Sequence, residues 1–180
     1  MHLMCHSLPD DRPGSDPPIA TAVRVIGLGN PEAGDDALGL IAIRKLRATY
    51  GDAPDVELIE AGPAHRITDL LDDVDAVVVV DAVRTRGGQR RAGEIIRVAL
   101  GIPGALDVVK SSLSSHGFGL AEALGLAAAL RSTGRFVFFG IEVADVTTGR
   151  RLSPPVAAAM PKLQEMIESE VSALRRAAGG

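Results

Sequence analysis

The sequence predicts an α/β domain with three layers, α/β/α, in which a twisted, mostly parallel five-stranded sheet lies between helices. Three observations predict this fold class. Short apolar runs rich in β-branched residues alternate with stretches of helical periodicity, which is typical of strands joined by crossover helices. One of these runs contains four consecutive valines, so it is apolar toward both faces, as in a parallel sheet. The length of 180 residues suits one domain of this kind.

The first half of the chain supplies three of the expected strands and two of the expected helices. The strands are short apolar runs, and we place them over residues 22–29, 56–62 and 75–83. A helix is expected over 35–50, with Asp35 as its N-cap, because its apolar residues recur at helical spacing (Leu38, Ile41, Ala42 and Leu46). Residues 64–73 are expected to form a second helix.

The second half completes the sheet and ends in a long helix. Residues 93–100 read as a fourth strand, which we expect to pair beside the strand before it, and residues 135–143 read as a fifth. Between them, residues 118–134 are expected to form an alanine-rich helix that stops near Gly134. The closing segment, 153–180, begins with a serine cap and two prolines and repeats apolar residues at helical spacing, so it predicts a long amphipathic helix.

Residues 1–20 differ from the rest of the chain. They are rich in proline, aspartate and serine, and they offer too little apolar surface to offset the entropy of ordering them. We therefore expect a flexible N-terminal tail over 1–20 and a single α/β domain over 21–180. On such a tail, the grouping of His2, Cys5 and His6 is interpreted as incidental.

Composition excludes several classes of function. The net charge of -4 gives no overall positive field for a nucleic-acid partner. The single cysteine, Cys5, can form neither an intramolecular disulfide nor a multi-cysteine zinc site. No stretch has the pattern of a secretory signal or the length of a membrane span, so we expect a cytoplasmic protein without a membrane partner. We also expect a monomer.

The glycine-containing turn GLGN, residues 27–30, could in principle hold a phosphate between a strand and a helix. The dinucleotide fingerprint requires glycine at position 32, where this chain has Glu32, and a P-loop requires a lysine that the turn lacks. We therefore expect no organic cofactor. The glycines are better explained by a tight turn with positive φ.

Three polar residues are expected at the carboxyl ends of strands, where parallel α/β sheets place their functional groups. Asp36 follows the first strand, Asp81 ends the valine strand, and His116 precedes the alanine-rich helix. Two carboxylates and an imidazole suit a borderline divalent metal such as nickel or zinc. Each residue also has a purely structural interpretation, as a helix cap or a turn residue. For His65, which starts a predicted helix, the structural interpretation is preferred.

Three segments carry a resemblance to a known family: GLGNPEAGDDALG (27–39), VVVVDAV (77–83) and SSHGFGL (114–120). In this order and spacing they resemble the hydrogenase maturation endopeptidases, and the likeness spans roughly residues 22–175. Within it, Asn30 and Gly39 match the motif around the first acid. Ala37 stands where many members have glycine, and residues 62–66, GPAHR, lack the glycine-rich loop expected there.

The resemblance implies an endopeptidase that removes the C-terminal extension of a nickel-iron hydrogenase large-subunit precursor after nickel insertion. It implies that Asp36, Asp81 and His116 contact the metal and act in catalysis, and that the nickel is carried by the substrate. The metal is expected to polarise either an attacking water or the scissile carbonyl, which leaves the enzyme as an aspartic-type or unclassified peptidase. Two alternatives stay open: a peptidyl-tRNA hydrolase-like esterase, suggested by VIGLGNP (25–31), and a noncatalytic nickel-binding maturation chaperone.

Overall fold

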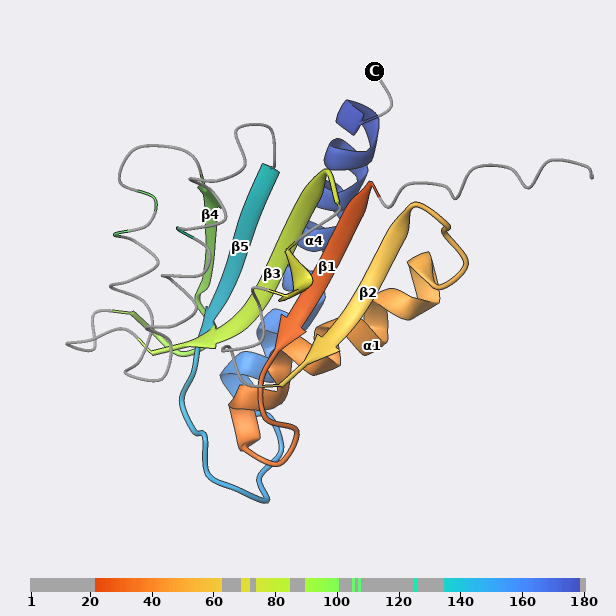
Figure 1. Ribbon diagram of the computed structural model, residues 1–180. Coiled ribbons are helices and arrows are strands. Elements are labelled where there is room, and N and C mark those ends of the chain that lie inside the picture. The colour runs from red at the N-terminus through yellow and green to blue at the C-terminus, as the bar shows by residue number, and fades with distance from the viewer. Residues whose placement is uncertain are drawn as a thin grey trace, which may run out of the picture.

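A five-stranded sheet forms the centre of the domain. The computed structural model describes residues 22–62, 69–71, 74–84, 90–100, 105, 107, 125 and 135–178. The strands are arranged in the order β2-β1-β3-β5-β4 (Figure 1), and their bounds are β1 (Val23–Leu28), β2 (Val56–Ala61), β3 (Ala76–Val83), β4 (Ile95–Leu100) and β5 (Arg135–Glu142). All neighbours pair in parallel except β4 and β5, which are antiparallel. The predicted fold class, an α/β domain with a mostly parallel five-stranded sheet, is confirmed.

Two long helices cover one face of this sheet. A short 3-10 helix, η1 (Gly34–Ala37), leads into α1 (Leu38–Tyr50), and α4 (Pro154–Ala178) closes the described chain (Figure 1). The predicted apolar stripe of α4 is buried against the sheet and α1 (Val156, Met160, Leu163, Ile167, Val171 and Leu174). Although α4 has 25 residues, neither it nor any other described helix is apolar enough over a sufficient length to cross a membrane.

The core consists of two layers of apolar side chains, one on each face of the sheet. Alternate residues of β3 belong to different layers: Val78 and Val80 pack with α1 and α4, whereas Val77 and Val79 pack on the opposite face. On that opposite face the described residues Leu71 and Ala105 join the cluster. The valine run is therefore buried on both sides, which confirms the reason for expecting a central parallel strand.

The place of β4 in the sheet differs from the prediction. We expected it beside β3, its predecessor in the sequence, but β5 lies between them and β4 forms the sheet edge. An interior strand must be apolar on both faces, and β5 meets that requirement because seven of its eight residues are buried. In β4 the pattern alternates, and the half-exposed Arg97 forms an ion pair with Glu170 of α4, 2.7 Å from Nε to Oε2. A strand with an exposed charged side chain is suited to the edge of a sheet.

Several predicted elements lie outside the described residues. They are the N-terminal tail over 1–20, most of the helix expected over 64–73 and nearly all of the helix expected over 118–134. The described residues all lie within the domain expected over 21–180.

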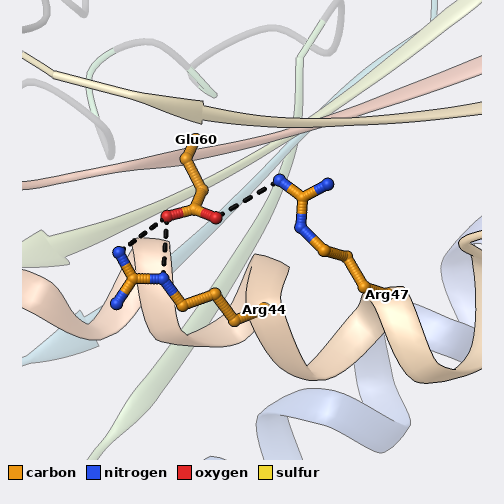
Figure 2. A network of polar contacts seen from close by, with 3 residues as sticks. All are labelled: Arg44, Arg47 and Glu60. Carbon is orange, nitrogen blue, oxygen red and sulfur yellow. Dashed lines mark hydrogen bonds and ion pairs between the residues drawn. The ribbon is translucent and has the colours of Figure 1, made fainter.

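An ion-pair network ties the edge strand β2 to α1. Glu60 lies between two arginines of α1 (Figure 2), and its carboxylate accepts hydrogen bonds from Arg44 Nε at 2.8 Å and Arg47 Nη2 at 3.2 Å. Partial burial raises the pKa of Glu60, but the hydrogen bonds and charges of the two arginines outweigh it, so the pKa lies below its ordinary value of 4.5.

We expect Glu60→Gln to lower the free energy of unfolding at pH 7 by less than about 1 kcal/mol, because both arginine side chains are half exposed to water. A lowered pKa means that this contribution is present above pH 4.5 and is lost as the pH falls through the folded-state pKa. Urea unfolding of both proteins at pH 7 and pH 4 measures it. A loss that is equal at the two pH values would contradict the assignment.

Candidate active site

The carboxyl ends of β1 and β3 meet the start of α1 at unusually short range. A methyl group placed on Gly39 would overlap the carbonyl oxygen of Leu28 in β1 and would lie 2.6 Å from the carbonyl oxygen of Val80 in β3. Only glycine allows α1 to begin so close to these two strand ends. The residues flanking these contacts, Asp36 before Gly39 and Asp81 after Val80, are thereby brought to one edge of the sheet.

Asp36 lies in the loop between β1 and α1, residues 29–37, here called the site loop. Gly29 starts the loop with a φ of +145°, as predicted, and a side chain there would overlap the backbone oxygen of Asp36. The prediction was wrong for Gly27, which lies in β1 without a positive φ; a side chain there would overlap the carbonyl oxygen of Gly39. The half-buried Asp36 carboxylate accepts a hydrogen bond from the backbone N–H of Asn30 at 3.0 Å. The Asn30 side chain in turn accepts one from the N–H of Glu32 at 3.0 Å, so it orders the turn.

Asp81 lies near the carboxyl end of β3, beside Gly140 of β5 in the sheet register. Its Oδ1 accepts a hydrogen bond from the Ala82 N–H at 2.8 Å. The residue is partly accessible, yet desolvation of its carboxyl group and then the negative charge of Asp36 raise its pKa to about 7, against the smaller opposing effect of that hydrogen bond. The structure therefore brings Asp36 and Asp81 within electrostatic range, and Asp81 titrates near neutral pH.

Asp35 does not have the role predicted for it. We expected an N-cap, but neither η1 nor α1 has a side-chain cap. The Asp35 side chain is fully buried and accepts hydrogen bonds from the backbone of residues 144, 145 and 153. Burial alone would raise its pKa, but hydrogen bonds from Asp145, Ser153 and Ala144 outweigh it and lower the pKa below 3.8.

The predicted cap of α4 is also used differently. The Ser153 carbonyl accepts the first helical hydrogen bond, from Ala157 N–H at 2.8 Å, so Ser153 occupies the expected N-cap position. Its hydroxyl donates to the Asp35 carboxylate at 2.8 Å. Sequence reasoning found the position of this serine but missed its partner, because the partner lies 118 residues away.

The third predicted site residue, His116, lies outside the described residues, as does His65. Of the three predicted residues, the described part of the chain includes Asp36 and Asp81. Within the described ranges no group of three histidine, cysteine, aspartate or glutamate side chains is placed to hold a metal ion. Among the described residues, the same edge of the sheet also carries acids that the sequence analysis did not single out: Glu60 near the carboxyl end of β2, and Glu142, 4% exposed, at the carboxyl end of β5.

Comparison with known proteins identifies the family. The family model for hydrogenase maturation protease, HycI, matches residues 41–170. The chain belongs to the hydrogenase maturation protease family. The match covers Asp81 and His116, whereas Asp36 precedes it. Membership makes the chain a peptidase of hydrogenase maturation, and the predicted family resemblance is confirmed.

Solved structures of hydrogenase maturation proteases share the fold. The NiFe hydrogenase maturation protease HybD from Thermococcus kodakarensis is 26% identical, with a TM-score of 0.65 over 82% of this chain and 97% of that one. The hydrogenase maturating endopeptidase HybD from E. coli is 20% identical, with a TM-score of 0.68 over 87% and 93%. HycI from T. kodakarensis KOD1 is 23% identical, with a TM-score of 0.60 over 82% and 90%. No curated protein sequence matches the chain.

Proposed function

We propose that this maturation protease removes the C-terminal extension of a nickel-iron hydrogenase large-subunit precursor once nickel has been inserted. Asp36, Asp81 and His116 are assigned to contact the nickel, which arrives as part of the substrate. The observation that carries the proposal is that Asp36 and Asp81 lie at the carboxyl ends of β1 and β3, where desolvation and then the charge of Asp36 raise the pKa of Asp81.

The electrostatics of this pair favour a cation. Desolvation and then the negative charge of Asp36 raise the pKa of Asp81 to about 7, so the two carboxylates together favour a bound positive charge, whether a proton or a cation. A divalent cation presented by the precursor replaces that proton and removes the repulsion. A precursor without nickel brings no cation to relieve the repulsion between the two carboxylates. The protease therefore binds the nickel-loaded precursor in preference to the nickel-free one.

The same pair accounts for the proposed aspartic-type chemistry. A bound metal fixes the scissile bond near Asp36 and Asp81, which is the positioning component of catalysis. A carboxyl group with a pKa of about 7 can both accept and donate a proton at neutral pH, which suits the removal of a proton from an attacking water. We place this reaction in the cytoplasm, with the protease acting as a monomer.

The test is incubation of the full chain with a purified large-subunit precursor, prepared with and without nickel. We expect the nickel-loaded precursor to be shortened at its C-terminus and the nickel-free precursor to remain intact, as measured by intact-protein mass spectrometry. Unchanged length accompanied by nickel transfer to the chain would favour the noncatalytic chaperone instead. Cleavage of both precursors at equal rates would contradict metal recognition.

A further inference from the structure

We propose that Asp35 is a positioning residue for the reaction, because its buried carboxylate joins the site loop to the segment that links β5 to α4 and so fixes the orientation of Asp36. That segment, residues 143–153, is here called the β5–α4 segment. The inference rests on the proposed function, because the proposed function assigns Asp36 to the reaction. The junction itself is a property of the fold (Figure 1), since both segments lie at the edge of the sheet where β1 ends.

The Asp35 carboxylate is saturated by donors from the β5–α4 segment. Its Oδ2 accepts hydrogen bonds from the N–H groups of Ala144 and Asp145, both at 2.9 Å, and from Ser153 Oγ at 2.8 Å. Its Oδ1 accepts one from the Ser153 N–H at 2.6 Å. All four partners donate, and the side chain is 0% exposed. An ionised carboxylate has the lone pairs to accept all four hydrogen bonds. The positive end of the α4 helix dipole further stabilises its negative charge.

Backbone contacts extend this junction along both segments. The Asp35 N–H donates to the Asp145 carbonyl at 2.8 Å, and the Gly149 N–H donates to the Glu32 carbonyl at 2.7 Å. Gly34 has a φ of +51°, and a methyl group on it would lie 2.7 Å from the Asp145 carbonyl oxygen. The site loop is therefore held against the β5–α4 segment along several residues, with the Asp35 carboxylate as the charged centre.

Asp36 follows directly in the chain, so the junction determines how it is presented. Its N–H donates to the Ala33 carbonyl at 2.9 Å, and its carboxylate accepts from the Asn30 N–H. Both of these partners lie in the site loop itself. Asp35 thus provides the loop with side-chain contacts to a distant part of the domain. A loop that shifts by about 1 Å can cost on the order of 10²-fold in rate, because the reacting groups lose their alignment.

The test uses Asp35→Asn in the full chain. An amide has only one acceptor oxygen, so its NH₂ group must face a donor in the β5–α4 segment. We expect faster amide hydrogen exchange in both the site loop and the β5–α4 segment, with unchanged exchange in β3. For the nickel-loaded precursor we expect kcat to fall by about 10- to 100-fold and KM to change by less than about 3-fold, measured where circular dichroism shows a fully folded protein.

Two variants serve as controls. Asp55→Asn disrupts another carboxylate with side-chain hydrogen bonds at 2.6 and 2.9 Å from Arg175, which lies toward the C-terminal end of α4. It should leave kcat within about 2-fold of the wild-type value. Ser153→Ala removes one donor and keeps the Ser153 N–H, so we expect a kcat between those of wild type and Asp35→Asn.

The outcomes separate the two proposals. Wild-type kcat in Asp35→Asn, or an equal loss in Asp55→Asn, would overturn the positioning role while leaving the protease assignment intact. If the wild-type chain does not cleave the precursor, the proposed function fails. Hydrogen exchange in Asp35→Asn then still tests whether Asp35 joins the site loop to the β5–α4 segment. Unchanged exchange of the β5–α4 segment in Asp35→Asn would overturn it, and faster exchange in both segments would support it.

Discussion

Replacing Asp81 with asparagine is expected to abolish processing of the nickel-loaded precursor and, at the same time, to stabilise the fold above neutral pH. Asparagine can still accept the hydrogen bond from the Ala82 N–H, so the local backbone geometry is retained. It can neither carry the charge that contacts a cation nor take up a proton. We expect the processing rate to fall by about 10³-fold or more, as measured by the appearance of the shortened precursor.

The gain in stability follows from the raised pKa of Asp81. Folding moves this pKa from 3.8 to about 7, so the contribution of Asp81 to stability is fully present below pH 3.8 and is lost as the pH rises through about 7. At pH 8 the wild-type protein must bury a charge that Asp81→Asn lacks. Allowing for partial exposure of the residue, we expect the variant to be more stable by about 1–3 kcal/mol at pH 8.

Urea unfolding at pH 5 and pH 8 measures this difference, which should be clearly smaller at pH 5. A matched control is Asp52→Asn, because Asp52 is an exposed aspartate in the turn before β2. We expect it to change neither processing nor stability at either pH. A variant of Asp81 that is less stable than wild type at pH 8 would show that the carboxylate is stabilised in the fold, contrary to the raised pKa.

Replacing Gly39 with alanine is expected to cause a large loss of stability. The new methyl group would lie 2.6 Å from the carbonyl oxygen of Val80 and 2.8 Å from the backbone nitrogen of Leu28. Both atoms belong to the backbone of central strands and cannot turn away, so α1 must move as a unit. We expect the free energy of unfolding to fall by about 2–4 kcal/mol.

Gly62→Ala is the control, because a methyl group at Gly62 meets no atom of the described residues within 4 Å. Its effect on stability should stay within about 0.5 kcal/mol. Thermal and urea unfolding of the three proteins provide the comparison, and the processing assay should show that Gly39→Ala also reduces activity because Asp36 moves with the start of α1. Equal stabilities for Gly39→Ala and Gly62→Ala would contradict the close approach of α1 to β1 and β3.

The sheet could be predicted from the sequence where burial alone determines the pattern. The consecutive valines of β3 and the apolar run of β5 are buried on both faces, and these are the strands that form the middle of the sheet with β1. The position of β4 was wrong because adjacency in the sequence was used in place of burial. Its exposed Arg97 was the signal that could have placed it at the edge.

The candidate site could be predicted only in part, for a different physical reason. Asp36 and Asp81 were predicted to lie at one edge of the sheet because the carboxyl ends of parallel strands meet there, and the family resemblance selected Asp36 over Asp35. Asp35 and Asp36 are identical in type and adjacent in sequence, and nothing local distinguishes them. Their difference comes from donors at residues 144–153, more than 100 residues away, so only the folded chain reveals which acid is buried and which is presented.

The helix α4 also has a consequence for how the protein can be shortened. It starts at the serine that binds Asp35, and toward its other end Arg175 holds Asp55 just before β2. With 25 residues it reaches across about 37 Å. The helix therefore spans the domain from the segment that binds Asp35 to the residues just before β2, and removing its last turn would remove the Arg175–Asp55 ion pair.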